Sequence, residues 1–275
     1  MSTTSNQPQA SSLSTLPLEI HDLTVAYTKR PALYGIDLEV PQGSIVGVVG
    51  PNGAGKSTLI KAIMDLMPTA SGWIKVFGKP FKKAVTRVGY VPQRESVDWD
   101  FPVNALDVVL MGRYGRLGLF KRPSKADKEI AMTCLEKVKM TPYAKRQISN
   151  LSGGQQQRVF LARALAQESD LYLMDEPFVG VDATTEAAII EILRELQAHG
   201  KTLLVVHHDL TTAPEYFDRI LLLNMRVVAY GKTEEVFTFD NLQNAYGGRL
   251  SILSEVALTR ARKKFEGDTP ENLGQ

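Results

Sequence analysis

One stretch of the sequence combines glycines, a lysine and a serine in an order that suits phosphate binding. It matches the pattern G-x-x-x-x-G-K-[ST], and together with the next residue it comprises Gly50, Pro51, Asn52, Gly53, Ala54, Gly55, Lys56, Ser57 and Thr58. Glycines let backbone N–H groups turn inward around a phosphate, and a following helix N-terminus adds partial positive charge. We expect Lys56 to reach the β- and γ-phosphates and the Ser57 hydroxyl to bind Mg²⁺. The stretch therefore predicts a binding site for a nucleoside triphosphate.

A second glycine-containing segment, Leu151-Ser152-Gly153-Gly154-Gln155, precedes a strongly helical pattern that reaches Leu165. Two glycines and a serine at a helix N-terminus can also surround an anion. The segment contains no lysine, so we do not expect an independent phosphate site. Its predicted task is to contact a γ-phosphate that is already held elsewhere.

Two adjacent acids follow the apolar run Leu171–Met174, which reads as a buried strand. The carboxyl ends of parallel strands are where α/β sheets bind ligands. Because adjacent side chains diverge, Asp175 and Glu176 can have separate roles. We expect Asp175 to serve the Mg²⁺ shell and Glu176 to orient or deprotonate a water that attacks the γ-phosphate.

Another apolar run, Leu203–Val206, ends in His207-His208-Asp209. This run invites a metal-site interpretation, but consecutive strand residues point to opposite faces, so both histidines cannot easily bind one ion. A single histidine that hydrogen-bonds a phosphate at the end of the strand fits better. The sequence alone leaves open which histidine does so.

The residues that surround these motifs predict the elements that must position them. Ile45–Val49 reads as a parallel strand buried on both faces, and Leu59–Met67 has helical spacing before Pro68. Alternating apolar residues from Leu18 to Val40 predict short antiparallel strands. Further strands are expected over 72–77 and over 88–93, the second of which ends on Gln93.

The middle of the chain, residues 104–148, reads as helical, and Ser124 with Asp127 resembles a capping box before its second helix. The basic turn Arg113–Arg122 is interpreted as a solvated loop between helices rather than a phosphate-binding patch. The stretch Val97–Val103 mixes acids with large aromatics, and two roles remain open for it, packing or the docking of a partner.

The later part of the chain alternates helices and strands. A helix is expected after Asp182 and ends at Gly200, and a hairpin spans 220–230. A short helix over 233–237 and a last strand over 250–253 complete the prediction. Residues 1–16 are rich in Ser, Thr and Gln and are predicted to be a disordered tail without signal-peptide features, and residues 251–275 form a strand and a charged tail.

Bulk composition limits the function classes. The 275 residues carry a net charge of +2, which offers no electrostatic reason to expect a nucleic-acid partner. The one cysteine, Cys134, excludes an internal disulfide and reads as a small residue of an apolar helix face. No apolar run approaches the roughly 18 residues that span a bilayer. A soluble intracellular protein is therefore expected.

Taken in order, the motifs resemble those of the nucleotide-binding subunit of an ABC transporter, from about Leu18 to Val236. The resemblance implies an α/β fold of the P-loop NTPase class, the ABC cassette, over residues 17–250. Such a cassette has a mostly parallel core sheet, an N-terminal antiparallel β subdomain and an α-helical subdomain, here at about 94–165. It also implies ATP and Mg²⁺ as cofactors.

By the same resemblance, two copies form a head-to-tail homodimer with two ATP molecules between them. Each ATP then lies between the lysine loop of one subunit and Ser152–Gln155 of the other. Tyr27 becomes the residue that stacks on adenine, Gln93 touches Mg²⁺ and the attacking water, and Glu176 is the general base. His208 contacts the γ-phosphate, and Asp182 belongs to the nucleotide-binding set.

A narrower resemblance is carried by Val91–Gln93, Val97–Val103, Met111–Gly115 and Asp175–Asp182, which look like segments of the ATPases of manganese, zinc and iron importers. It implies integral membrane permease subunits, an extracytoplasmic metal-binding protein as an indirect partner, and a peripheral position on the cytoplasmic side of the cell membrane. Manganese is favoured as the cargo. Val97–Val103 and Arg113–Arg122 are the expected docking surface.

The alternative is a soluble single-cassette ATPase in an assembly complex, such as one for iron–sulphur cluster biogenesis. The segment between Lys56 and Leu151 is too short for the long coiled coil of repair and chromosome ATPases. The single cassette also argues against the translation type.

Overall fold

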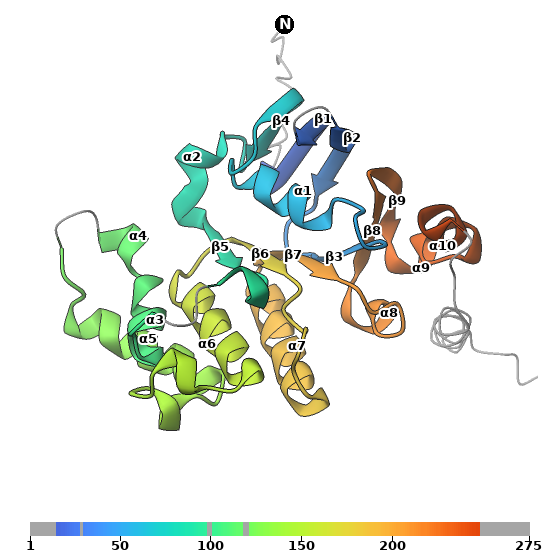
Figure 1. Cartoon of the computed structure of the whole chain (residues 1–275). Helices are drawn as coiled ribbons and strands as arrows, with labels where there is room; N and C mark the ends of the chain where they lie inside the picture. The colour runs from blue at the N-terminus through green and yellow to red at the C-terminus, as the bar shows by residue number, and fades with distance from the viewer. Residues whose placement is uncertain (1–14, 28–29, 98–100, 118–120, 248–275) are drawn as a thin grey trace, which may run out of the picture.

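The computed structural model describes residues 15–27, 30–97, 101–117 and 121–247, which form two β-sheets and a group of helices (Figure 1). The predicted strand of residues 250–253, the aromatic Trp99 and both chain tails, apart from residues 15 and 16, lie outside the described residues. No described helix combines the length and the apolar character that crossing a membrane requires.

The central sheet has the strand order β5-β6-β7-β3-β8-β9. Its strands are β3 (Ile45–Val49), β5 (Val88–Val91), β6 (Leu171–Asp175), β7 (Thr202–His207), β8 (Arg219–Asn224) and β9 (Arg226–Lys232). All neighbouring pairs are parallel except β8 and β9, which form the predicted hairpin. Every residue of β3, β6 and β7 is buried, as the apolar runs predicted. The carboxyl ends of four neighbouring parallel strands, β5, β6, β7 and β3, therefore meet at one edge.

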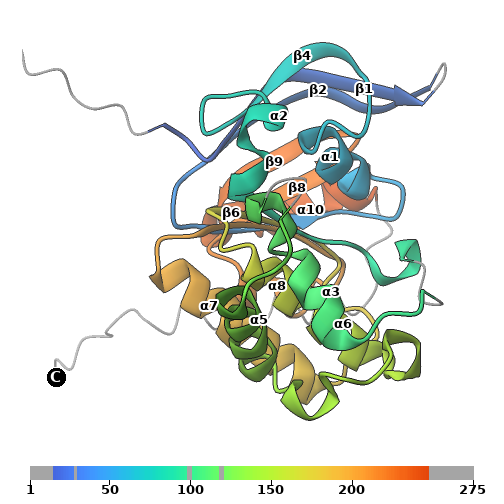
Figure 2. The same cartoon turned by 90° about the vertical axis from the view of Figure 1, so that its left-hand side faces the viewer.

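A second, antiparallel sheet has the order β2-β1-β4 and consists of β1 (Leu18–Tyr27), β2 (Arg30–Val40) and β4 (Thr69–Val76). Its inner face packs on α1 (Lys56–Ile63), which lies between the two sheets (Figures 1 and 2). The other side of α1 packs on Val46 and Val48 of β3. The helix that follows the lysine loop is thereby held by apolar packing on both of its sides.

The opposite face of the central sheet is covered by helices (Figure 2). They are α3 (Ala105–Met111), α5 (Lys125–Lys137), α6 (Gly153–Ala166) and α7 (Ala183–Ala198). The short helix α4 (Tyr114–Leu117) follows α3 and has no buried residue. Three of them, α3, α5 and α6, begin with full capping boxes, at Asn104, Ser124 and Ser152. Cys134, a residue of α5, is buried in the hydrophobic core that these helices share, as predicted.

Short elements complete the described residues. They are α2 (Phe81–Ala84), η1 (Val85–Arg87), η2 (Arg94–Ser96), η3 (Thr141–Tyr143), η4 (Ile148–Asn150), α8 (Ala213–Tyr216), α9 (Thr233–Val236) and α10 (Phe239–Tyr246). The predicted fold class is confirmed. The boundaries of the proposed subdomains stay a prediction, although α3 to α6 fall close to the expected range of 94–165.

One predicted helix end is wrong. The helical spacing up to Met67 placed the end at Pro68, but α1 ends at Ile63. The Leu66 N–H donates to the Lys61 carbonyl at 2.9 Å, and Asp65 takes a φ of 57°. This closure resembles a Schellman motif, in which one left-handed residue satisfies the last carbonyls of the helix.

Candidate nucleotide-binding and hydrolysis site

The Gly50–Ser57 loop joins β3 to α1 at the carboxyl edge of the central sheet. Gly55 directly precedes α1 and has a φ of 94°, a left-handed conformation that favours glycine. At Gly50 the loop passes the end of β8 so closely that a Cβ would lie 2.0 Å from the Leu223 carbonyl oxygen. Both glycines are therefore required by the path of the backbone.

Lys56 is buried and its ammonium is held by the loop itself. Its Nζ donates to the Gly50 carbonyl oxygen at 2.7 Å and to the Pro51 carbonyl oxygen at 3.0 Å. Burial lowers the pKa of Lys56, while the charges of Glu176 and Asp175 act in the opposite direction. Among the described residues, the two acids predicted from the sequence, Glu176 and Asp175, act as countercharges to this cation.

Asp175 ends β6 and lies beside the first turn of α1. The Ser57 Oγ donates to its Oδ1 at 3.0 Å, and the Asp175 side chain is almost fully buried. Burial raises the pKa of Asp175, the hydrogen bond from Ser57 opposes that shift, and nearby Glu176 adds to it. Hydroxyl and carboxylate oxygens are the donors that Mg²⁺ prefers, so this pair fits the ion that the sequence predicted.

Glu176 and Gln93 form the second pair. The Gln93 Nε2 donates to the Glu176 Oε2 at 3.0 Å, which connects the residue after β6 to the second residue after β5. Glu176 has a φ of 53°, so the backbone turns sharply directly after Asp175. The two adjacent acids consequently have different partners, as their separate roles would require.

The two histidines occupy different environments. His207 ends β7 and is buried, and its Nε2 lies 2.8 Å from the Thr212 Oγ1. Burial lowers its pKa to about 4, helped by the neighbouring His208. His208 comes directly after the strand and is exposed at the same sheet edge as Glu176. Of the two, only His208 is accessible to a phosphate.

The Ser152–Gln155 segment opens α6 with a capping box. The Gln155 N–H donates to the Ser152 Oγ at 3.4 Å, and the Ser152 N–H donates to the Gln155 Oε1 at 2.9 Å. A Cβ on Gly154 would lie 3.7 Å from the Val181 Cγ1, next to Asp182. Asp182 in turn caps α7, where its Oδ1 accepts from the Thr185 N–H at 2.8 Å. Ser152–Gln155 thus has the geometry of a capping box and lies next to the residues that precede α7.

Of the two remaining site residues, the structure describes the side chain of Thr58 but not that of Tyr27. Thr58 is buried in the first turn of α1. Tyr27 is the last residue of β1, but its side chain lies outside what the structure describes, so adenine stacking stays a prediction.

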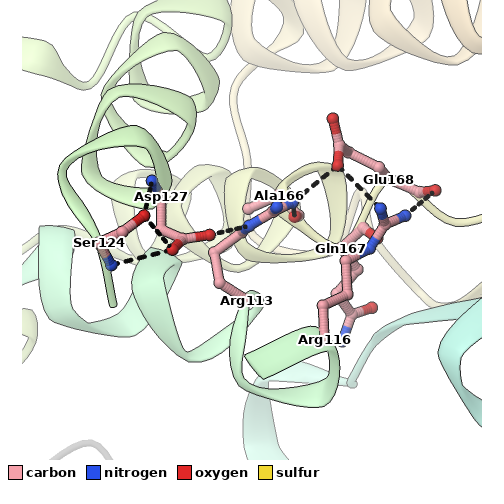
Figure 3. A network of polar contacts seen from close by, with 7 residues as sticks. All are labelled: Arg113, Arg116, Ser124, Asp127, Ala166, Gln167 and Glu168. Atoms are coloured by element: carbon pink, nitrogen blue, oxygen red, sulfur yellow. Dashed lines mark hydrogen bonds and ion pairs between the residues drawn. The ribbon is translucent and has the colours of Figure 1, made fainter. Parts of the chain in front are cut away.

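The interpretation of the basic turn as a solvated loop is wrong for Arg113 (Figure 3). This side chain is buried: its Nε donates to the Asp127 Oδ1 at 3.0 Å, and its Nη1 donates to the Glu168 Oε2 and the Ala166 carbonyl, both at 2.8 Å. Arg116 donates to the Gln167 and Glu168 carbonyls. The C-terminal carbonyls of α6 attract both cations. Lys121 and Arg122 are exposed, as predicted.

The Val97–Val103 stretch has a mixed character. Val97 and Val103 pack on the core, whereas Phe101 is 56% exposed. Residues 98–100 lie outside the described residues. Packing is therefore confirmed for Val97 and Val103, and docking by the rest of the stretch stays a prediction.

The chain is similar in sequence and in fold to known proteins. Residues 33–179 match the family model described as ABC transporter. The chain is 63% identical to the manganese transport system ATP-binding protein MntB of Bacillus subtilis, over 90% of this chain and 99% of the relative. It is 59% identical to the zinc transport system ATP-binding protein TroB of Treponema pallidum, over 85% and 88%. A solved ATP-binding subunit of an ABC transporter superposes with a TM-score of 0.72 at 29% identity, over 89% and 99% of the two chains.

Proposed function

The chain belongs to the ABC transporter family as one of its ATP-binding subunits, and from this premise we propose that it hydrolyses ATP to energise import of a divalent metal ion, manganese first, through a separate membrane permease. One observation carries the proposal: the Ser57–Asp175 and Gln93–Glu176 pairs lie at one sheet edge beside Lys56. Phosphoryl transfer to water needs a lysine that binds the phosphates, oxygen ligands for Mg²⁺ and a carboxylate that can take a proton from the water.

The nucleotide site is built on the lysine loop. We expect Lys56 to exchange its bonds to the Gly50 and Pro51 carbonyls for the β- and γ-phosphate oxygens, which carry more charge. Ser57, Asp175 and Gln93 would hold Mg²⁺, which would neutralise part of the phosphate charge when bound. Tyr27 is proposed to stack on the adenine.

Hydrolysis is assigned to Glu176. Its Oε2 accepts from Gln93 in the described structure. An ionised carboxylate has about four acceptor positions, so this bond still allows Glu176 to take a proton from a water. His208 is exposed at the same edge. It is proposed to donate a hydrogen bond to the γ-phosphate and thereby to sense whether a triphosphate is bound.

The site is completed by a second copy of the chain. We propose a head-to-tail dimer in which Ser152–Gln155 of one copy closes over the triphosphate held by the other. The capping box supports this role because it orders the free N–H groups of the first turn of α6. Asp182 is proposed to lie at the same interface.

The permease is proposed to dock beside α4. A groove of about 240 Å³ is lined by Phe81, Val85, Tyr90, Gly115 and Arg116, among others. Val85 and Tyr114 expose large apolar surfaces next to or within this region, and Gly115 and Arg116 belong to the predicted docking stretch. A peripheral position on the cytoplasmic face follows from such docking, and an extracytoplasmic metal-binding protein would act only through the permease.

The metal is tested by uptake. In a strain that lacks this chain, we expect uptake of manganese to fall and to be restored by the wild-type gene but not by a Glu176→Gln variant. Zinc and iron are measured separately in the same cells. Loss of zinc uptake with intact manganese uptake would move the assignment to zinc, and unchanged uptake of all three metals would contradict the transport proposal and favour the soluble assembly ATPase.

A further inference from the structure

His207, the buried histidine at the end of β7, lies among aromatic rings. The ring centroids of Phe178 and Phe217 are 5.3 and 5.4 Å from its own, and both rings meet it edge-on, at interplanar angles of 90° and 69°. Phe217 has no room to yield, because a Cβ built on Gly47 of β3 would lie 2.3 Å from its Cδ2. The imidazole is therefore held in place by rings from two other segments of the chain.

The loop that follows His207 returns to it. The His207 Nε2 and the Thr212 Oγ1 are 2.8 Å apart, so one hydrogen bond spans the whole loop. Inside the loop, the Asp209 Oδ1 accepts from the Thr211 N–H at 2.7 Å and from the Thr211 Oγ1 at 2.6 Å. The loop is thus closed at its base and ordered within, and its exposed residue is His208.

Phe178 connects this arrangement to the hydrolytic carboxylate. The Val179 N–H donates to the Glu176 carbonyl at 3.3 Å, which closes a turn that contains Phe178. Strands β6 and β7 are parallel neighbours, and Glu176 directly follows the first while His208 directly follows the second. The contact between Phe178 and His207 therefore joins the turn that begins at Glu176 to the strand end that carries His208.

The spacing of Glu176 and His208 matters because both are proposed to act at one γ-phosphate. Catalysis by fixed groups depends on small distances, and a misplacement of about 1 Å can cost about 10²-fold in rate. An exposed side chain on a loop is mobile unless buried contacts hold the loop. The contacts of His207 are buried and can supply the rigidity that His208 itself lacks.

We propose that His207 is a positioning residue for hydrolysis. Through Thr212 it fixes the loop that carries His208, and through Phe178 it sets the position of this loop relative to Glu176. Its side chain is almost fully buried, so it acts through these neighbours and not on the nucleotide. The inference rests on the proposed function, in which Glu176 is the base and His208 contacts the γ-phosphate.

The contact with Thr212 is tested by steady-state hydrolysis of ATP with Mg²⁺ by the whole chain. Thr212→Val keeps the shape of the side chain but removes the hydroxyl, so kcat should fall by about five- to tenfold, the range of one lost hydrogen bond. The KM for ATP should change by less than about threefold. Thr212→Ser keeps the hydroxyl and should retain kcat within about twofold. Thr133→Val, which removes a hydroxyl from an exposed position of α5, is the matched control and should leave both constants unchanged.

A comparison in a second background shows whether Thr212 acts through His208. In His208→Ala, the further change Thr212→Val should lower the single-turnover rate by less than about twofold, because the loop then carries no group to position. The melting temperature of each variant should stay within about 3 °C of its parent, which separates a loss of position from a loss of folded protein.

The contact with Phe178 is tested by Phe178→Leu, which keeps an apolar side chain but loses the ring edge. We expect kcat to fall by about two- to tenfold, the range of one aromatic pair, with little change of KM. Phe178→Leu combined with Thr212→Val should cost less than the product of the two single effects, since both act on His207. Independent effects that multiply would contradict a shared role.

The outcomes separate this inference from the proposed function. A wild-type kcat in Thr212→Val overturns the positioning role and leaves the ATPase assignment intact, and so does a Thr212→Ser variant that is as slow as Thr212→Val. An equal loss from Thr212→Val with and without His208 overturns it as well. Wild-type turnover by His208→Ala, or no hydrolysis by the wild type, contradicts the proposed function and the inference together.

Discussion

At the scale of single residues, adjacent side chains at the candidate site lie in sharply different environments. Asp175 is buried and accepts from Ser57, while Glu176 turns away through a φ of 53° and accepts from Gln93. His207 is buried with a depressed pKa, while His208 is exposed. Such contrasts arise at the end of a buried strand because successive side chains point in opposite directions and therefore meet different surroundings.

The role of Glu176 is tested by Glu176→Gln. The amide keeps the size of the side chain but cannot take a proton from water, so we expect ATP hydrolysis to fall by about 10²- to 10⁴-fold while nucleotide affinity changes little. Size-exclusion chromatography with ATP and Mg²⁺ should show a stable dimer of the variant. Turnover at the wild-type rate would remove Glu176 as the base.

The buried His207 predicts a stability loss in acid. Its folded pKa of about 4 lies below the usual 6.5, so the unfolded chain binds more protons between these values. The contribution of this residue is fully present above pH 6.5 and is lost as the pH falls towards 4, by about 3 kcal/mol from the two pKa values.

Urea unfolding of the wild type and His207→Gln at several pH values measures this effect. The difference in unfolding free energy between them should shrink steadily from pH 6.5 to pH 4.5. His199→Gln, which changes an exposed histidine, is the control and should leave the pH dependence as in the wild type. Parallel pH curves for the wild type and His207→Gln would contradict the depressed pKa.

The position of each motif in the fold could be predicted from the sequence better than the contacts that hold its residues. Local patterns sufficed to place Gly50–Ser57 and the acids after β6 at strand ends, because each motif is contiguous. They could not show that Phe178 packs on His207 or that Arg113 reaches Glu168, since these partners are brought together only by packing between distant segments. No short-range pattern distinguishes such an arginine from a solvated one.

At the scale of elements, the helices over the central sheet are joined by buried polar contacts as well as by apolar packing. Arg113, just after α3, reaches Asp127 in the first turn of α5 and Glu168 just after α6 (Figure 3). Asp127 also closes the capping box with Ser124, and these hydrogen bonds hold its pKa at about 2. One network therefore sets the mutual positions of three helices.

We expect Arg113→Met to destabilise the chain by about 3 kcal/mol, because two acidic partners lose a buried cation. Arg122→Met removes an exposed arginine nearby and should cost little. Chemical denaturation of both variants measures the difference. Equal stabilities would show that the network contributes nothing beyond the surface charges.

The end of α1 shows why element boundaries are harder to predict than elements. Apolar spacing continued to Met67, but the Leu66–Lys61 hydrogen bond ended the helix earlier. The deciding residue, Asp65, is not a glycine, so the left-handed closure carries no obvious signal in the sequence.

At the scale of the whole molecule, strand β5 connects the proposed ATP site with the groove proposed for the permease. The proposed ATP site occupies the carboxyl edge of the central sheet, and the groove lies between α2, β5 and the α3–α4 turn. Tyr90 lines that groove and belongs to the strand that ends just before Gln93. A permease segment in the groove would therefore lie a few residues from the hydrolysis site.

We predict that Val85→Asp lowers metal uptake by about tenfold or more, since a carboxylate would face the apolar wall of the docking groove. ATP hydrolysis by the isolated chain should stay within about twofold of the wild type, because the substitution is remote from the phosphate loop. The control is Phe239→Asp on α10, also an exposed apolar residue but on the opposite side of the molecule (Figure 1). Equal uptake by the two variants would reject the groove as the docking site.

The buried Cys134 has a practical consequence for observing this molecule at work. Burial raises the pKa of its thiol to about 11, which leaves it almost entirely in the unreactive protonated form at neutral pH. No other cysteine is present. A cysteine introduced at an exposed position such as Ser149 or Lys61 can therefore carry a dye without removal of the native thiol. Fluorescence energy transfer between two copies labelled in this way would show in real time whether ATP brings them together, as the proposed dimer requires.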